Sequence, residues 1–135
     1  SAWRAVAWVT AKENFDGILY WATAIFNPET PFVNNANGVN GDGVLQYPAE
    51  DGTPLASIRL KVICDGMEDY EYMVLLKNAV AEAKQAKKAP ALIAEAEELL
   101  KLDTVFRTMD DYSRSEADYR NFRRTAAKLI GQLER

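Results

Sequence analysis

The chain of 135 residues contains no histidine and a single cysteine, Cys64. Without an imidazole it cannot by itself build a histidine-activated nucleophile, a histidine proton relay or an ordinary zinc site. One cysteine also excludes an internal disulfide and a cysteine-rich metal site. Because Val62, Ile63 and Met67 surround Cys64 in the sequence, we expect its thiol to be a small buried apolar group. Carboxylates, amides and aromatic rings are left for chemistry.

The chain also lacks any run of about 20 apolar residues, the length that spans a bilayer, and no signal peptide is visible at its start. We therefore predict no membrane partner. The net charge is −4, and the basic residues are interleaved with acids, so no basic face predicts a nucleic-acid partner. The glycines at 38, 41 and 43 lead into an extended segment rather than a phosphate-binding helix, and no cofactor is predicted.

A hydrophobic fraction of 48% over this length is enough for one core, and we predict a single unit of residues 1–135. Residues 2–14 form an almost entirely apolar helix pattern, which the turn at Asp16-Gly17 ends. The short apolar run at residues 18–21 predicts a strand buried on both faces. A polar loop follows over residues 22–53, interrupted by an extended piece at 44–47.

Helices dominate the second part, residues 54–135. Ser57 is a good N-cap for one long helix over residues 57–87, whose apolar stripe crosses Gly66 in phase. The alternative is a break at Gly66, with Asp65 as a cap and Glu68 completing a capping box. Pro90 predicts the first residue of the next helix. The residues of that helix expected to point inward are Leu92, Ala96, Leu99 and Leu100.

The last helix is predicted from a capping box at Ser113 and Glu116 followed by a clean apolar seam. The seam consists of Tyr119, Phe122, Ala126, Leu129 and Leu133. The fold class predicted from these patterns is mostly α with one or two short β segments.

Three motifs carry a family resemblance. They read Gly-Ile-Leu-Tyr-Trp at 17–21, Asn-Gly-Asp-Gly-Val-Leu-Gln-Tyr-Pro at 40–48, and Ser-Ile-Arg-Leu at 57–60 continuing to Asp-Gly-Met-Glu-Asp-Tyr-Glu-Tyr at 65–72. Together they resemble the C-terminal region of bacterial glycoside-hydrolase-like proteins similar to glycoside hydrolase family 123, the β-N-acetylgalactosaminidases.

This resemblance implies the C-terminal portion of a (β/α)₈-type barrel, with residues 1–53 supplying the last helix, strand and substrate-side loop, and residues 54–135 a helical cap. It implies a parent glycosidase acting on N-acetylhexosamine-type glycans, located outside the cytoplasm of a bacterium. The family's catalytic pair is an adjacent Asp and Glu at a strand end, next to which the substrate's acetamido group acts as nucleophile. This chain has no position for that pair, so we assign no catalytic residue and expect the chain alone to be inactive.

The acidic cluster of Asp65, Glu68, Asp69 and Glu71 invites a catalytic assignment because glycoside hydrolysis needs two carboxyl groups. Helical acids spread over several faces, however, and are usually solvated or paired with neighbours. We expect these acids to be solvated or paired with neighbours such as Arg59 or Lys61.

Substrate contacts are predicted instead for aromatic and amide side chains near the loop. Trp21, at the end of the expected strand, can stack on a sugar face, although a tryptophan there is equally often core. We expect Tyr20 to point the other way, into the core. Asp42 and its neighbours can read hydroxyls or merely form turns. The complete predicted substrate-binding set is Trp21, Phe26, Asn37, Asn40 and Asp42, with Phe32 as a possible extension.

Two other hypotheses remain open at this point. Residues 38–43 resemble the middle of a calcium loop, but Gly38 and Ala49 stand where the strong first and last ligands belong, so no metal site is assigned. The chain also fits a non-catalytic helical interaction or carbohydrate-binding module. An unpaired central strand and an apolar first helix predict a covering partner, either the remaining barrel or a second copy.

Overall fold

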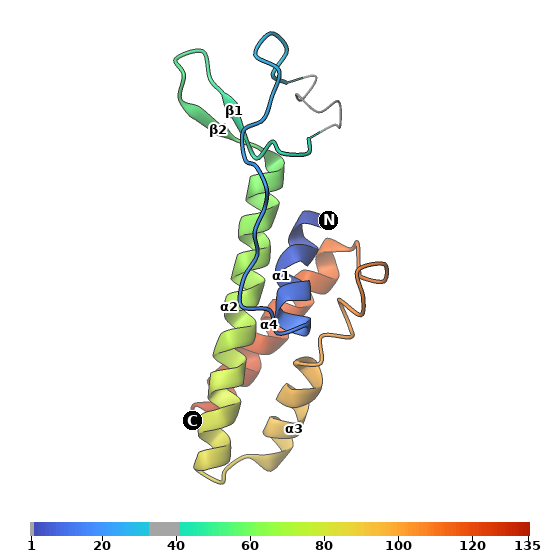
Figure 1. The fold of residues 1–135 in the computed structure, drawn as a ribbon. Coiled ribbons are helices and arrows are strands. Elements are labelled where there is room, and N and C mark those ends of the chain that lie inside the picture. The colour runs from blue at the N-terminus through green and yellow to red at the C-terminus, as the bar shows by residue number, and fades with distance from the viewer. Residues whose placement is uncertain (1, 33–40) are drawn as a thin grey trace.

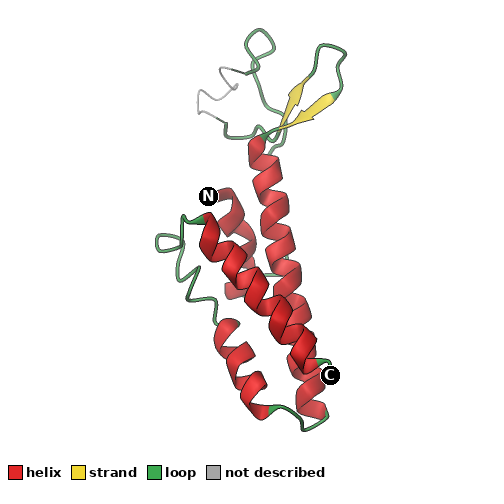
Figure 2. Ribbon diagram, turned by 180° about the vertical axis from the view of Figure 1, so that it is seen from behind, coloured by secondary structure: helices red, strands yellow, loops and turns green. Residues whose placement is uncertain are grey.

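The computed structural model describes residues 2–32 and 41–135, and this part of the chain is mostly helical with one two-stranded sheet (Figures 1 and 2). The elements follow in the order α1 (Ala2–Lys12), β1 (Gln46–Pro48), β2 (Pro54–Ala56), α2 (Ile58–Gln85), α3 (Pro90–Leu99) and α4 (Glu116–Leu133). The hairpin stands at one end of α2, while α1, α3 and α4 pack along the rest of it. The predicted fold class, mostly α with short β segments, is confirmed.

Helix α2 is the longest of the described helices. It has 28 residues and a length of about 42 Å at 1.5 Å per residue. Ser57 caps it, because its Oγ accepts a hydrogen bond from the amide of Leu60 at 3.2 Å. The prediction of one continuous helix is confirmed, and the alternative break at Gly66 is wrong. Gly66 lies where α1 crosses α2, so that an added Cβ would lie 2.8 Å from the carbonyl oxygen of Arg4.

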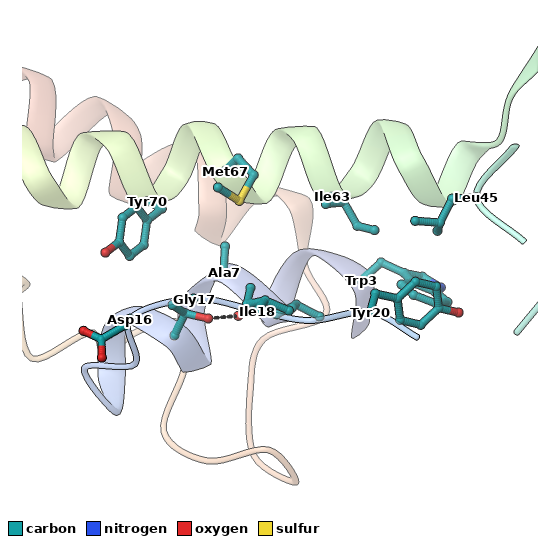
Figure 3. A pocket seen from close by; sticks show the side chains of 12 residues that line it. Trp3, Ala7, Asp16, Gly17, Ile18, Tyr20, Leu45, Ile63, Met67 and Tyr70 are labelled. Carbon is teal, nitrogen blue, oxygen red and sulfur yellow. Dashed lines mark hydrogen bonds between the residues drawn. The ribbon is translucent and has the colours of Figure 1, made fainter. Parts of the chain in front are cut away.

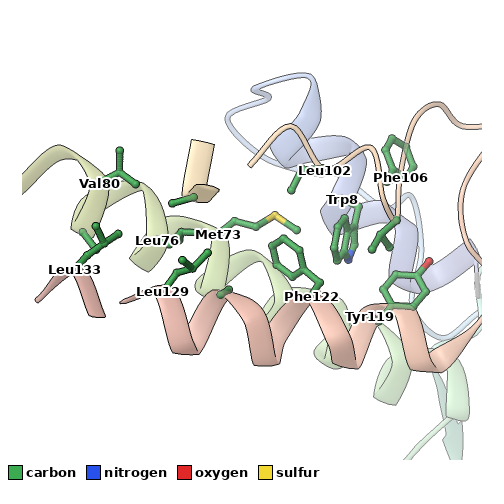
Figure 4. Packing of buried hydrophobic residues seen from close by; sticks show 14 of the residues in the cluster. Trp8, Met73, Leu76, Val80, Leu102, Phe106, Tyr119, Phe122, Leu129 and Leu133 are labelled. Atoms are coloured by element: carbon green, nitrogen blue, oxygen red, sulfur yellow. The ribbon is translucent and has the colours of Figure 1, made fainter. Parts of the chain in front are cut away.

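The hydrophobic core joins all four helices (Figure 4). The predicted seam of α4 is confirmed, since all five of its residues are buried. Trp8 of α1 is fully buried and packs edge-to-face against Tyr119 and Phe122, with ring centroids 5.4 and 4.7 Å apart. Pro90 begins α3 as predicted, and Ala96 is the buried centre of that short helix.

A buried ionic cluster crosses this core. The carboxylate of Asp69 is completely buried and accepts hydrogen bonds from Arg4 Nε at 2.7 Å, Arg4 Nη2 at 2.9 Å and Trp8 Nε1 at 2.8 Å. Arg123 of α4 donates to the same carboxylate. Arg4 also binds both oxygens of Glu116. Asp69 is therefore paired, as the structural interpretation of these acids expects, but its partners are arginines of α1 and α4 rather than Arg59 or Lys61.

The hairpin pairs β1 and β2 antiparallel, with Tyr47 opposite Leu55. Its turn is closed by Asp51, whose Oδ1 accepts hydrogen bonds from the amide and hydroxyl of Thr53, and by Gly52 at φ +81°. The sequence pattern predicts an extended piece near β1, at residues 44–47, but β2 is not predicted. Asp-Gly at the turn is the signal that could have found the hairpin.

Residues 18–21 differ from their prediction. They form neither a strand nor a helix, and Ile18 and Leu19 are 49% and 90% exposed. The prediction of a strand buried on both faces is wrong for this chain. The physical reason is that a strand needs a neighbour to receive its hydrogen bonds, and within the described residues no other segment pairs with this backbone.

Two smaller predictions are also wrong. Cys64 is exposed on α2 rather than buried. The capping box at Ser113 does not form, because α4 begins at Glu116 with Ser115 as its N-cap, and Glu116 binds Arg4 instead.

Among the described residues, none of the helices combines the length and apolar character that crossing a membrane requires.

Candidate functional site

Two of the predicted substrate-binding residues meet at the hairpin end of the molecule. Trp21 donates a hydrogen bond from its indole Nε1 to Asp42 Oδ1 at 3.1 Å. The hydroxyl of Tyr20 donates to the same oxygen at 3.0 Å and accepts a bond from the amide of Gly43 at 2.7 Å. Tyr20 is thus part of the site, and its prediction as core pointing away from Trp21 is wrong.

Trp21 is held in place and yet half-exposed, with 51% of its surface accessible. Gly43 packs against the ring so closely that an added Cβ would lie 2.9 Å from Trp21 Cζ2. Gly43 has φ +72°, a left-handed conformation that glycine adopts without strain. The alternative interpretation of Trp21 as ordinary core does not fit this exposure.

Arg59, near the start of α2, supports the loop that carries Asp42 through its side-chain hydrogen bonds. Its Nε donates to the carbonyl of Val44 at 2.8 Å and its Nη2 to the hydroxyl of Tyr47 at 2.6 Å. Gly41 packs on the guanidinium, since a Cβ there would lie 2.6 Å from Arg59 Nη1. Asp42 is therefore framed by two glycines, one packed on an arginine and the other on a tryptophan.

Backbone bonds tie the two halves of the site together. Ala24 and Val44 form an antiparallel bridge, and the amide of Leu45 donates to the carbonyl of Thr23 at 2.7 Å. The segment that carries Trp21 and the loop that carries Asp42 therefore keep a fixed register, although 21 residues separate these two side chains.

The other predicted residues are less closely joined to this pair. Phe26 is half-buried just beyond the Ala24 bridge. Phe32 is 64% exposed and stacks obliquely on Tyr47 with ring centroids 5.1 Å apart. Asn37 and Asn40 lie outside the described residues. Residues 38–40 of the segment that resembles a calcium loop also lie outside them.

An apolar groove of about 380 Å³ runs between α1, α2 and residues 16–20 (Figure 3). Tyr20 stands at one end of it beside Trp3 and Leu45, and Tyr70 stands at the other end beside Asp16. The ring of Trp3 meets that of Tyr20 edge-to-face at 5.4 Å. The groove thus connects α1 with the site.

Electrostatics at the site favour a neutral Tyr20. Burial raises the pKa of its hydroxyl, and the hydrogen bond to the Asp42 carboxylate raises it further, against the lowering effect of the Gly43 amide. The hydroxyl therefore stays protonated at neutral pH and remains a donor to Asp42.

A comparison with protein families matches residues 1–76 to the model of the glycoside hydrolase 123 catalytic domain. This match covers more than half of the chain. The chain belongs to the glycoside hydrolase 123 family. Searches of the curated proteins and of the solved structures found no match.

Membership of glycoside hydrolase family 123 links the chain to carbohydrate. The matched region contains α1, the hairpin and every residue of the Tyr20, Trp21, Asp42 and Gly43 cluster, and it ends within α2. Among the described residues, no three cysteine or acidic side chains gather in a way that would hold a metal ion.

Tyr47 and Arg59 are not among the residues predicted for the site. Both lie in motifs that carry the family resemblance, at 40–48 and 57–60. In the structure the two motifs are in contact, since Arg59 of one donates to Val44 and Tyr47 of the other. Only the fold brings the two motifs into contact.

Proposed function

We propose that this chain is the C-terminal part of a glycoside hydrolase that acts on N-acetylhexosamine-containing glycans, and that Trp21 and Asp42 form part of its sugar-binding wall. The observation that carries the proposal is the half-exposed Trp21 ring, held in one orientation beside a carboxylate. A sugar presents an apolar C–H face and a rim of hydroxyls. An aromatic ring and a neighbouring acceptor are complementary to those two surfaces.

The catalytic carboxylate pair, in this proposal, belongs to a part of the protein outside this chain. The acids of α2 support this division of labour. Asp69 is fully buried and bound by Arg4 and Arg123, and Glu68 pairs with Arg123. The buried carboxylate of Asp69 therefore supports the packing of helices and has no access to a substrate.

Residues 18–21 would form the last strand of a (β/α)₈-type barrel in the longer protein. Three features support this placement: the segment lies against the groove between α1 and α2, its backbone has no strand partner among the described residues, and Leu19 is 90% exposed. Barrel strands run between consecutive helices, and their C-terminal ends face the active site. Trp21, at that end of the segment, would then face the substrate.

The test is calorimetric titration of the chain with methyl N-acetyl-β-galactosaminide. We expect a dissociation constant of roughly 1 mM or weaker, because the chain supplies only one wall of the site. Trp21→Ala should weaken binding about tenfold, which corresponds to roughly 1.4 kcal/mol.

Phe15→Ala is the matched control, because Phe15 is a 53% exposed aromatic residue in the connection between α1 and residues 18–21. Its dissociation constant should equal that of the wild type. Equal affinities of the wild type and Trp21→Ala, or equal losses in both variants, would refute the assignment of Trp21.

A further inference from the structure

The hydroxyl of Tyr20 uses its hydrogen-bonding capacity in two directions. It donates to Asp42 Oδ1 at 3.0 Å and accepts from the amide of Gly43 at 2.7 Å. It therefore holds the side chain of one loop residue and the backbone of the next. Trp21 reaches the same Asp42 oxygen, so the position of its ring depends on where Tyr20 holds that carboxylate.

We propose that Tyr20 is the positioning residue of the sugar site, holding Asp42 and Gly43 so that the Trp21 ring keeps its exposed orientation. This inference rests on the proposed function, because Trp21 and Asp42 are the groups that would touch the sugar. Tyr20 itself is half-buried in the wall of the apolar groove and acts through its neighbours.

The geometry makes the hydroxyl, rather than the ring alone, the important group. Without it, the Gly43 amide and the Asp42 carboxylate each lose a partner. Gly43 has a left-handed backbone at φ +72° and packs on Trp21. Once its amide loses the bond to the Tyr20 hydroxyl, Gly43 can adopt many other backbone conformations. The tryptophan ring would then lose both its hydrogen-bond acceptor and its packing surface.

Helix α1 supports the ring of Tyr20. The Trp3 ring packs edge-to-face on the tyrosine at an interplanar angle of 90°. The next residue, Arg4, is fixed by its bidentate contact with the buried Asp69. The ring of Tyr20 is thus supported from a rigid part of the core, while its hydroxyl reaches the loop.

The experiment compares Tyr20→Phe with Tyr70→Phe. Tyr70 is the matched control because it is a half-buried tyrosine at the far end of the same groove. Two quantities are measured: the exchange rate of the Gly43 amide with solvent, and the dissociation constant for methyl N-acetyl-β-galactosaminide. In Tyr20→Phe we expect both to rise about tenfold, as loss of one or two hydrogen bonds predicts. In Tyr70→Phe both should match the wild type.

A purely structural role of Tyr20 would lower the melting temperature without a selective effect at Gly43. Gly43 exchange in Tyr20→Phe equal to that in Tyr70→Phe would refute the positioning role, whether or not the sugar binds. Failure of the wild type to bind the sugar would instead refute the proposed function. The two failures are therefore distinguishable in one set of measurements.

Discussion

Gly66 shows how one residue decides the packing of two helices. Its lack of a side chain lets the backbone of α1 approach α2, so that an added Cβ would meet the Arg4 carbonyl oxygen at 2.8 Å and the Ala7 Cβ at 3.3 Å. Glycine within a helix costs about 1 kcal/mol relative to alanine. At this crossing glycine is nevertheless the favourable residue, because a larger side chain would separate α1 from α2.

Gly66→Ala should therefore destabilise the protein by about 2 kcal/mol, because the contact with a backbone oxygen outweighs the gain in helix propensity. Gly131→Ala is the control. That glycine lies in α4 with no heavy atom within 4 Å of an added Cβ, so its replacement should stabilise by about 0.5–1 kcal/mol. Urea denaturation measures both. A Gly66→Ala protein as stable as the wild type would contradict the packing described.

Tyr119 makes stability depend on alkaline pH. Burial raises the pKa of its hydroxyl to about 12, whereas an unfolded tyrosine ionises near 10. Between these values the unfolded state has lost the proton and the native state keeps it, so the free energy of unfolding falls as pH rises from about 10 to 12. The loss should reach about 2 kcal/mol. Denaturation curves of the wild type and Tyr119→Phe across this range measure it, and equal pH slopes would contradict the prediction.

At the scale of elements, the Asp69 cluster fastens α1 and α4 to α2. The buried carboxylate binds Arg4, Trp8 and Arg123, and Arg4 additionally stacks on the Tyr119 ring with Cζ 4.5 Å from the centroid. A buried charge is stable only while its partners remain. The cluster therefore makes the arrangement of three helices cooperative.

Asp69→Asn should destabilise the protein by about 3–5 kcal/mol, because it removes the buried counter-charge that Arg4 and Arg123 share and leaves the buried Arg4 with Glu116 alone. Glu71→Gln, at an exposed position two residues along the same helix, should change stability by less than about 0.5 kcal/mol. Thermal unfolding followed by circular dichroism compares the two. Equal melting temperatures would show that the cluster contributes little.

The elements that the sequence predicts are those whose signals are local. The seam of α4, the Pro90 start of α3 and the Ser57 cap of α2 depend on neighbouring residues, and all three are confirmed. The capping box at Ser113 fails because Glu116 binds Arg4, which lies 112 residues away. A partner so distant in sequence leaves no periodic or motif signal.

The site illustrates the same limit. Trp21 and Asp42 could be nominated from residue type and position, but their contact depends on the bridge between Ala24 and Val44. Alternation of side chains along a regular strand predicts Tyr20 in the core. Residues 18–21 are not a regular strand in this chain, so Tyr20 and Trp21 both reach Asp42.

At the scale of the whole molecule, the family match and the core divide the chain differently. The match to glycoside hydrolase 123 ends at residue 76, within α2, whereas the hydrophobic core continues through α3 and α4. The C-terminal helix α4 packs directly on the matched region, where it holds α1 through Glu116 and α2 through Arg123. We propose that it acts as a scaffold for the sugar-binding wall.

The most direct test of that wall is the indole N–H region of the NMR spectrum during titration with methyl N-acetyl-β-galactosaminide. The chain has three tryptophans, and Trp8 is fully buried while Trp21 is 51% exposed. The account predicts a saturable shift of the Trp21 resonance with Trp8 unchanged. A Trp21 resonance that stays in place up to saturating sugar, or one that moves only together with Trp8, would contradict it.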